Sequence, residues 1–486
     1  MRRFFSLLLA AAMLLSLVAC GSTPNEPGTQ GEDEPTRDGV AAQYLADFAV
    51  RTADYPALPA APSESELAAA FEALDYDKMG AEAYETAQQQ IWDDWDARSE
   101  AYYTALRALR SEGTAYPDAF LSFTRQVGAA LLSGEENTVL SPANLYLALA
   151  MLSETTDGAS RDELLTLLGL ADSDEARDAA NYIWRNLCEE TENCGTRLAA
   201  SLWLNEGVPY NESTLDILAE NYLASTYRAP MGTQETDRAI AAWVNENTGG
   251  LLEQAAGNLE TSAETVMLLL TTLYFKDAWS DDFAESLTAQ DIFTAFDGAQ
   301  QTVDFMHKTQ SGVSFTRGEN YTVAQLRFEG GQSMRFLLPD EGTTLESLLS
   351  DGSAVGGLLI YDMGVCRQVG ELIWSVPKFD VSSDLALTDA LKALGVTAVF
   401  DADAADFSPL LGEDEGAAVT RVQHAARVTV DETGCEAAAF TAIAADSAAP
   451  LFEDLPTVEM NLNRPFTFLI TGADGLPLFL GTVNSL

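Results

Sequence analysis

Histidine is nearly absent from this sequence, and so are the motifs that most enzymes and metal proteins carry. Only His307 and His424 occur in 486 residues, and they lie far apart in the chain. No pair of cysteines has the spacing of a zinc site, so we expect neither a metal nor a cofactor. A Gly-x-Ser-x-Gly elbow, a P-loop and a Rossmann glycine fingerprint are also missing. These absences predict that the protein is not an enzyme.

The acidic stretch DADAAD, residues 401–406, is similar to the start of a calcium-binding loop. It lacks the glycine at the sixth position and the glutamate at the twelfth that such a loop requires. We therefore interpret this stretch as a solvated acidic turn and expect no metal there.

Basic residues are scarce. The chain has 26 Lys and Arg against 75 Asp and Glu, which gives a net charge of −49 and a pI of about 4.1. Such a charge repels nucleic acid and anionic lipid headgroups, so neither is expected as a partner. Hydrophobic residues make up 47% of the chain, which is enough to fill a large core, so the chain as a whole is not predicted to be disordered.

Cysteine is sparse as well, which excludes a small disulfide scaffold. The five cysteines are scattered, at Cys20, Cys188, Cys194, Cys366 and Cys435. Cys188 and Cys194 are close enough in sequence to close a small loop, and the sequence leaves open whether they do.

A long apolar run occurs at the N-terminus, from Phe4 to Ala19, directly after Arg2 and Arg3. A basic start followed by an apolar run of this length is typical of a signal peptide, and an uncleaved anchor helix is the alternative. The stretch LVAC, residues 17–20, is similar to the lipobox of bacterial lipoproteins, in which the cysteine carries the lipid. This resemblance implies a signal peptide over residues 1–19, a lipid on Cys20 and a protein on the extracellular face of a bacterial membrane.

Two further segments precede the main body of the chain. Residues 20–40 are rich in Pro, Gly, Thr and acidic residues and show no periodicity, which predicts a flexible acidic tether. Residues 41–115 have apolar residues mostly at helical spacing, with Ser63 or Ser65 as a plausible N-cap and Gly113 near the end. We expect a helical extension whose aromatic residues pack against a neighbour, and we assign it no function.

The remainder, residues 116–486, mixes helical and strand patterns without a linker, which predicts an α+β domain. SAETVMLLLTTLYF and HAARVTV read as strands, and the helix that follows Ser141-Pro142 is expected to end near Gly158. The closing FTFLITGADGLPLFLGTVNSL reads as a hairpin that turns at residues 473–475.

Several motifs in this region resemble the serpin family, in family order from Phe120 to Leu486. They are NTVLSPANLYLALAMLSETTDGAS, AAWVNENTGGLL, LYFKDAWSDDF, VPKFDVSSDLALTDALKALGVTAVFDADAADFSPL and NRPFTFLI with LPLFLGTVNSL. The resemblance implies the serpin fold, an α+β architecture with a large central mixed sheet, two further sheets, surrounding helices and an exposed reactive-centre loop at about residues 432–457. It also implies a monomer that forms a covalent complex with a target serine protease.

The stretch VDETGCEAAAFTA resembles the serpin hinge, which after cleavage of the loop enters the central sheet as an extra strand. Every second residue of an inserted strand faces the core, so the uncharged Cys435, Ala437, Ala439, Thr441 and Ile443 would point inward. Gly434 would supply backbone freedom where the chain swings. An ordinary alanine-rich helix or linker is the alternative. The resemblance assigns the hinge to Glu432, Gly434, Cys435, Glu436, Ala437, Ala438, Ala439 and Thr441.

The family's usual loop length places the cleaved bond at Ala448–Ala449. The segment before NRPF is longer than usual, so the register could shift toward Leu451 or Phe452. A small apolar residue before the bond favours elastase-like or subtilisin-like proteases, and no basic residue lies between Glu432 and Met460 to attract a trypsin-like one.

The resemblance further implies a polar network beneath the strands that open, at Ser141, Asn144, Thr271 and His424. The amide that the family carries at the Thr271 position stands at Asn144 here, which could keep the network satisfied. Two functions follow: a membrane-anchored inhibitor of serine proteases, or a non-inhibitory serpin-fold binding or structural module. The uncharged inward face of the hinge favours the inhibitor.

Overall fold

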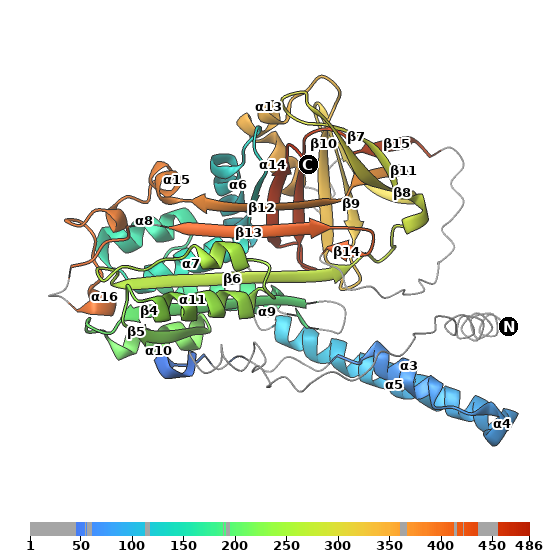
Figure 1. Cartoon of the computed structure of the whole chain (residues 1–486), viewed down its shortest axis with the longest axis horizontal. Helices are drawn as coiled ribbons and strands as arrows, with labels where there is room; N and C mark the ends of the chain where they lie inside the picture. Colours follow the sequence, from blue (N-terminus) through green and yellow to red (C-terminus); the bar gives the residue numbers. More distant parts are fainter. Residues whose placement is uncertain are drawn as a thin grey trace, which may run out of the picture. The chain divides into compact units, whose positions relative to one another are not determined.

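The computed structural model describes residues 45–53, 55, 61–111, 117–187, 189–190, 195–359, 367–412, 416–420, 422–435 and 455–486. Their strands form two mixed sheets with helices around them (Figure 1). The first sheet, called the central sheet below, contains the hinge residues Gly434 and Cys435. Its hydrogen-bonded order is β1 (Ala49–Arg51), β5 (Ala224–Ala229), β4 (Gly195–Asn205), β6 (Met267–Ala278), β14 (Gly434–Cys435), β13 (Gln423–Val430) and β12 (Phe379–Ala386), and β3 (Glu189–Glu190) pairs with β4.

The second sheet is longer and ends in the C-terminal hairpin. Its order is β15 (Thr457–Asn461), β11 (Arg367–Pro377), β8 (Gln300–Arg317), β9 (Tyr321–Arg327), β10 (Ser333–Pro339), β16 (Phe466–Thr471), β17 (Pro477–Val483) and β2 (Thr138–Leu140), and β7 (Ala289–Thr294) pairs with β8. Strand β8 pairs with β7, β9 and β11. The family resemblance implies two sheets besides the central one. Here β8 connects their strands by hydrogen bonds, so that they form a single sheet.

The helices run from the N-terminal extension to the segment before β13. They are α3 (Glu64–Glu72), α4 (Tyr76–Met79), α5 (Ala81–Ser111), α6 (Pro117–Leu131), α7 (Pro142–Glu154), α8 (Gly158–Leu168), α9 (Ser173–Leu187), α10 (Glu212–Asn221), α11 (Gln234–Asn247), α12 (Glu253–Gly257), α13 (Leu345–Ser350), α14 (Ser353–Leu359), α15 (Thr388–Ala393) and α16 (Ser408–Leu411), with 3-10 turns at Glu285–Leu287 and Ala398–Phe400.

The α+β class and the strand predictions are confirmed. Burial alternates strictly along β13, as a strand with one face on the core requires. The C-terminal hairpin turns at Gly475, whose φ of +86° lies in the left-handed region that favours glycine. Helix α7 is shorter than predicted. It ends at Glu154, and the next helix, α8, begins at Gly158.

The N-terminal extension is mostly helical, as predicted, and Ser63 caps α3 by accepting a hydrogen bond from the backbone N–H of Glu66 at 3.2 Å. Residues 49–51 are an exception, since they form strand β1 at the edge of the central sheet. The exposed edge of β5 offers backbone groups to which any extended segment can pair, and this outweighs local helical preference. Arg51 forms an ion pair with Asp216 beside it.

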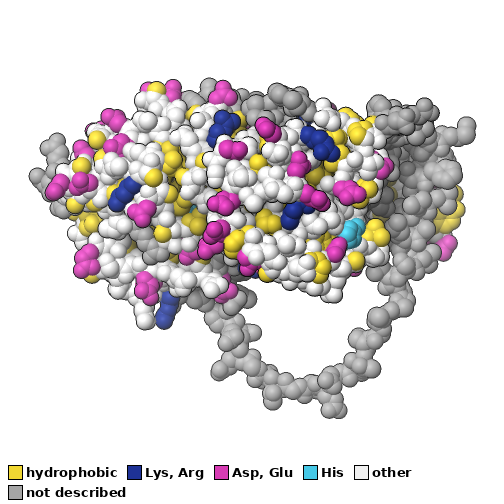
Figure 2. Space-filling view, turned by 90° about the horizontal axis from the view of Figure 1, so that it is seen from above, with side chains coloured by type: hydrophobic (Ala, Val, Ile, Leu, Met, Phe, Trp, Pro, Cys, Tyr) yellow, Lys and Arg dark blue, Asp and Glu magenta, His cyan; other side chains and the backbone are white. Residues whose placement is uncertain are grey.

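The surface reflects the acidic composition. Figure 2 shows Asp and Glu side chains spread over the displayed face with few Lys and Arg among them. No helix within the described ranges is both long and apolar enough to cross a bilayer.

Candidate functional site

The short strand β14 lies between β6 and β13 in the central sheet (Figure 1). Cys435 is opposite Val430 of β13 on one side and Asp277 of β6 on the other, and Gly434 is opposite Ala278. Both pairings are antiparallel, so β6 and β13 run parallel to each other. Two strand spacings, about 9.5 Å, therefore separate β6 from β13 at this level.

Beyond β14 the two strands are not joined. The ladder from β14 to β6 ends at Asp277, and the ladder to β13 ends at Val430. Within the described part of the chain, no other strand lies between β6 and β13, and no ladder pairs them with each other. The central sheet thus has a position for one more strand, and of the described residues only the two of β14 lie in it.

The start of the hinge is held in place by the end of β6. Trp279 donates a hydrogen bond from its backbone N–H to the carbonyl of Thr433 at 2.8 Å, and from its indole Nε1–H to the carbonyl of Asp431 at 2.9 Å. The Trp279 ring is buried and stacks on Phe328 with 4.4 Å between ring centroids. The Asp431 carboxylate accepts from the backbone N–H and the hydroxyl of Thr433, which closes a tight turn.

Glu432 is held by charge as well as by its backbone. Its carboxylate accepts hydrogen bonds from Lys378 Nζ at 2.7 Å and from the Thr288 hydroxyl at 2.9 Å. Its carbonyl accepts from the backbone N–H of Phe283 at 3.1 Å. Burial acts to raise the pKa of Glu432, but the hydrogen bonds from Lys378, from its own backbone and from Thr288 outweigh burial and lower it. The carboxylate is therefore ionised when it holds the hinge.

Gly434 is required by the closeness of β6. A Cβ atom at this position would lie 2.2 Å from the carbonyl oxygen of Asp277 and 2.9 Å from the Cα of Ala278. Its φ is outside the left-handed region. Letting two backbones approach is therefore a requirement for glycine at this position that the sequence-based interpretation, backbone freedom, does not include.

Cys435 is buried in the core, with 3% of its surface exposed. The side chains of Phe275 and Asp277 in β6, and of Val428 and Val430 in β13, are buried too, so this face of the sheet is the core face. The alternation predicted for the hinge gives Cys435 this same inward face. The remaining predicted hinge and bond residues, Glu436, Ala437, Ala438, Ala439, Thr441, Ala448 and Ala449, lie outside the described residues, as do Cys20, Cys188 and Cys194.

The four predicted network residues lie together at the N-terminus of α7. Ser141 is the N-cap, and its hydroxyl accepts from the backbone N–H of Asn144 at 3.2 Å. The backbone N–H of Ser141 donates to His424 Nε2 at 2.9 Å. Asn144 Nδ2 donates to the carbonyl of Thr271 at 3.1 Å, and the Thr271 hydroxyl donates to the carbonyl of Asn144 at 3.2 Å. One helix end is thereby bonded to both β6 and β13.

His424 is neutral and structural. Burial lowers its pKa from 6.5 to about 4, and the nearby Asp384 carboxylate opposes this shift. Because Nε2 accepts a hydrogen bond, the ring proton of the neutral form is assigned to Nδ1. Ser141 contacts the ring through its backbone and not its hydroxyl, so the two residues do not form a nucleophile and base.

The Asn144 amide is only half satisfied. Its nitrogen has the Thr271 carbonyl as partner, whereas its buried Oδ1 has no hydrogen-bond partner among the described residues. The expectation that an amide at Asn144 keeps the network satisfied therefore holds for the nitrogen and not for the oxygen.

Sequence reasoning did not identify the residues that hold the hinge. Lys378 and Trp279 lie within motifs that resemble the family, VPKF and LYFKDAW, but nothing in a single sequence pairs them with residues 431–433. Among the described residues, no cluster of His, Cys, Asp and Glu could hold a metal ion.

Comparison with known proteins agrees with this geometry. The family model described as Serpin (serine protease inhibitor) matches residues 120–486. Serpin-Z2A of Oryza sativa subsp. japonica is 29% identical over 407 residues, which cover 75% of this chain and 95% of that protein. Serpin-ZX of Arabidopsis thaliana is 27% identical over 368 residues, which cover 72% and 93%.

A solved structure shows the same arrangement of elements. The native state of Tengpin, a thermophilic serpin, matches with a TM-score of 0.67 and 25% identity over 76% of this chain and 93% of that one. Since the family model covers all of the chain from residue 120 to its end, the chain belongs to the serpin family, a family of serine protease inhibitors and not of enzymes.

Proposed function

We propose that this serpin inhibits a serine protease as a suicide substrate, with cleavage at Ala448–Ala449. The serine hydroxyl of the protease attacks the carbonyl carbon of Ala448, an ester forms, and Ala449 leaves as the new amino terminus with the transferred proton. The severed loop then enters the central sheet and carries the attached protease with it. The observation that carries this proposal is the position of β14, which starts a strand between β6 and β13 that no described residue continues.

The register of β14 indicates where each loop residue would arrive. Cys435 is opposite Asp277 and Val430, and in antiparallel pairing each step forward along the loop is one step back along both neighbours. Six steps bring Thr441 opposite both Thr271 and His424. One inserted residue would therefore stand between the two network residues that α7 holds.

The same register assigns the faces of the loop. Ala437 and Ala439 would lie beside Phe275 and Leu273 of β6, whose side chains are buried in the core. Glu436, Ala438 and Phe440 would alternate to the other face. Small uncharged residues would thus enter the core, and the one charge and the one large ring near the hinge would stay out of it.

The sequence around the bond favours a protease with a small apolar specificity pocket. Ala448 suits elastase-like and subtilisin-like enzymes, and a shift of the register toward Leu451 or Phe452 would still exclude trypsin-like enzymes, which require a basic residue. The partner we propose is therefore a serine protease of elastase-like or subtilisin-like specificity.

Incubation with subtilisin, pancreatic elastase and trypsin tests this proposal. We expect a complex with subtilisin or elastase that survives boiling in SDS, and a released peptide whose N-terminus is Ala449 by mass spectrometry. Trypsin should give no such complex. Cleavage in the loop by subtilisin and elastase without any stable complex would contradict inhibition and favour a non-inhibitory binding or structural module.

We further propose that the protein acts outside the cell, anchored by a lipid on Cys20 after removal of residues 1–19. The basic start, the apolar run and the LVAC sequence support this, and the family match leaves residues before 120 available for an anchor and a spacer. Labelling with a palmitate analogue should mark the chain and be lost in Cys20→Ser. Unchanged labelling in that variant would contradict the anchor.

A further inference from the structure

The hairpin of α3, α4 and α5 has an apolar seam that it cannot bury by itself. Of residues 65–100, all with described side chains, none is buried. Two short helices leave the borders of their apolar stripes exposed unless a third element covers them, since each stripe is wider than the line along which the helices meet. Further along α5, Tyr102 and Leu106 are buried, and α5 packs on α9 there. The hairpin is therefore anchored at one end and has its seam uncovered by described residues at the other.

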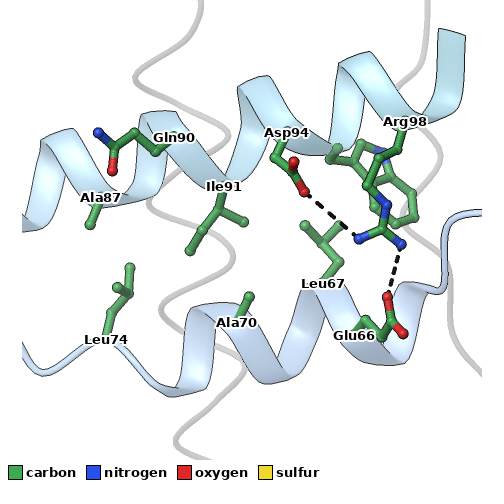
Figure 3. Close-up of a pocket in the computed structure, with 10 residues that line it drawn as sticks. Glu66, Leu67, Ala70, Leu74, Ala87, Gln90, Ile91, Asp94 and Arg98 are labelled. Atoms are coloured by element: carbon green, nitrogen blue, oxygen red, sulfur yellow. Dashed lines mark hydrogen bonds and ion pairs between the residues drawn. The ribbon is translucent and has the colours of Figure 1, made fainter. Parts of the chain in front are cut away.

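A groove runs along this seam between α3 and α5 (Figure 3). Its volume is about 310 Å³, and its apolar lining consists of Leu67, Ala70, Leu74, Ala87, Ile91 and Trp95. The lining spans twelve residues of α5, which at ~1.5 Å per residue is about 18 Å. A groove of this length and character fits the apolar face of one helix of about three turns.

Large apolar side chains are exposed around the groove. Trp92 is 43% exposed and rests against Phe71 with 5.3 Å between ring centroids, and Tyr76 at the hairpin tip is 56% exposed. Aromatic residues at the surface carry much of the binding energy in protein interfaces. These side chains add exposed apolar surface to the hairpin that forms the groove, and exposed apolar surface of this kind marks an interaction site.

The hairpin is strongly acidic. From Glu64 to Glu100 it has eleven acidic residues and two basic ones, Lys78 and Arg98. Both basic residues already form ion pairs inside the hairpin: Arg98 with Glu66 at 2.8 Å and with Asp94 at 3.7 Å, and Lys78 with Asp75 (Figure 3 shows the Arg98 pairs). Within residues 64–100 the excess negative charge thus has no counterpart.

This charge decides which occupant the groove favours. A second copy of the hairpin would bring a second excess of negative charge to the same place, and like charges facing each other disfavour an interface. A helix with Lys and Arg beside its apolar face would contribute the opposite charge. We propose that the α3–α5 hairpin binds a basic amphipathic helix of a partner protein, with the apolar face of that helix in the groove and its basic side chains along the acidic rims.

Fluorescence anisotropy with the full chain and a defined probe tests this assignment. The probe is a fluorescein-labelled peptide of about three helical turns, with Leu at positions i, i+3, i+4 and i+7 and Lys elsewhere. A second peptide keeps the leucines and replaces Lys with Glu. We expect saturable binding of the Lys peptide that weakens with added salt, and binding of the Glu peptide at least about tenfold weaker, a difference of ~1.4 kcal/mol. Equal binding of the two peptides would overturn the assignment.

Two matched substitutions in α3 locate the site. Ala70 lines the groove, whereas Ala68 is exposed on the same helix and is not part of the lining. Ala70→Phe should fill the groove and weaken binding of the Lys peptide about tenfold or more, while Ala68→Phe should leave it unchanged. Loss of binding in both variants, or in neither, would contradict binding in the groove.

A photo-crosslinking peptide keeps the test decisive if Ala70→Phe disturbs the hairpin. A benzophenone on the leucine face of the Lys peptide should crosslink to the wild-type chain within residues 66–74 or 87–98. Crosslinks elsewhere would overturn the assignment. Sedimentation that showed a dimer of the chain alone, lost in Ala70→Phe and kept in Ala68→Phe, would show instead that a second copy occupies the groove.

Discussion

The backbone N–H of Ser141 donates a hydrogen bond to His424 Nε2 at 2.9 Å, and this bond ties the first residues of α7 to β13. Three residues later, Asn144 ties the same helix end to β6 through the carbonyl of Thr271. The two strands on either side of β14 thus share one attachment, to the first turn of α7.

The His424 contact predicts an acid-sensitive native state. The pKa of His424 is about 4 in the folded protein and 6.5 when unfolded, so the unfolded form takes up the proton first. The stabilisation is fully present above pH 6.5 and is lost as the pH falls toward 4, to a limit of about 3 kcal/mol at ~1.4 kcal/mol per pKa unit. We expect the urea midpoint of the intact protein to fall over this window.

His424→Gln, which keeps an acceptor and cannot be protonated, should remove this part of the pH dependence. The matched control is His307→Gln, since His307 is only half-buried and lies in β8, away from the network. Identical pH profiles for the wild type and His424→Gln would show that His424 is not the group responsible.

Gly434→Ala should push the hinge out of the sheet. The new Cβ would meet the Asp277 carbonyl and the Ala278 Cα, which are backbone atoms that cannot turn aside, so overpacking should cost about 1–3 kcal/mol. Slower insertion should raise the number of inhibitor molecules consumed per protease molecule inactivated. Gly416→Ala is the control, because a Cβ there has no neighbour within 4 Å. An unchanged stoichiometry for Gly434→Ala would contradict the close approach seen between β14 and β6.

Glu432→Gln should loosen the start of the hinge. It removes the ion pair with Lys378, and because Lys378 is 40% exposed we expect a loss of about 1–2 kcal/mol in unfolding free energy, less than for a fully buried pair. The pKa of Glu432 is lower in the folded protein than in the unfolded one. Its contribution to the free energy of unfolding is therefore present at pH values above the unfolded pKa and is lost as the pH falls through the folded pKa. Asp380→Asn breaks the more exposed Arg427 pair in the same sheet and should cost less than about 1 kcal/mol. Equal losses in the two variants would contradict a special role for Glu432.

Two neighbouring alanines test the face assigned to the inserted loop. Ala437→Arg would carry a guanidinium toward the core beside Phe275 and should convert the inhibitor into a substrate, with cleavage but no stable complex. Ala438→Arg would place the same charge on the opposite face and should keep most of the inhibition. For each variant, the amount of SDS-stable complex is measured relative to the amount of cleaved protein. The reverse ranking would mean that the register is shifted by one residue.

Much of the fold could be predicted, because its long strands carry their own signal. In β13 the buried His424, Ala426, Val428 and Val430 alternate with less buried residues, and this period of two is visible in the sequence. The order of the motifs also predicts the family and its topology, and neither can be predicted from local patterns of hydrophobic residues.

The short strands could not be predicted. Strand β1 has three residues and β14 has two, too few to show a period, and each forms only because a distant strand offers an edge. The contacts that hold the hinge are equally invisible, since they join Trp279 and Lys378 to residues more than fifty positions away. The groove between α3 and α5 depends on how these two helices pack against each other, and their packing cannot be predicted from a single sequence.

Scanning calorimetry of the intact and the nicked protein tests most directly whether the loop completes the central sheet. A single cut between Ala444 and Phe452 should let the loop pair with β6 and β13, gaining about a dozen hydrogen bonds at ~1 kcal/mol each, offset by ordering entropy of ~1–2 kcal/mol for each newly ordered residue. Burial of small apolar side chains adds ~25 cal/mol per Å². Because the inserting segment stays attached to the sheet at Cys435, we expect several kcal/mol of net stabilisation. We predict a rise of the thermal midpoint on the order of 10 °C. A midpoint that stays the same or falls after nicking would show that the loop does not insert.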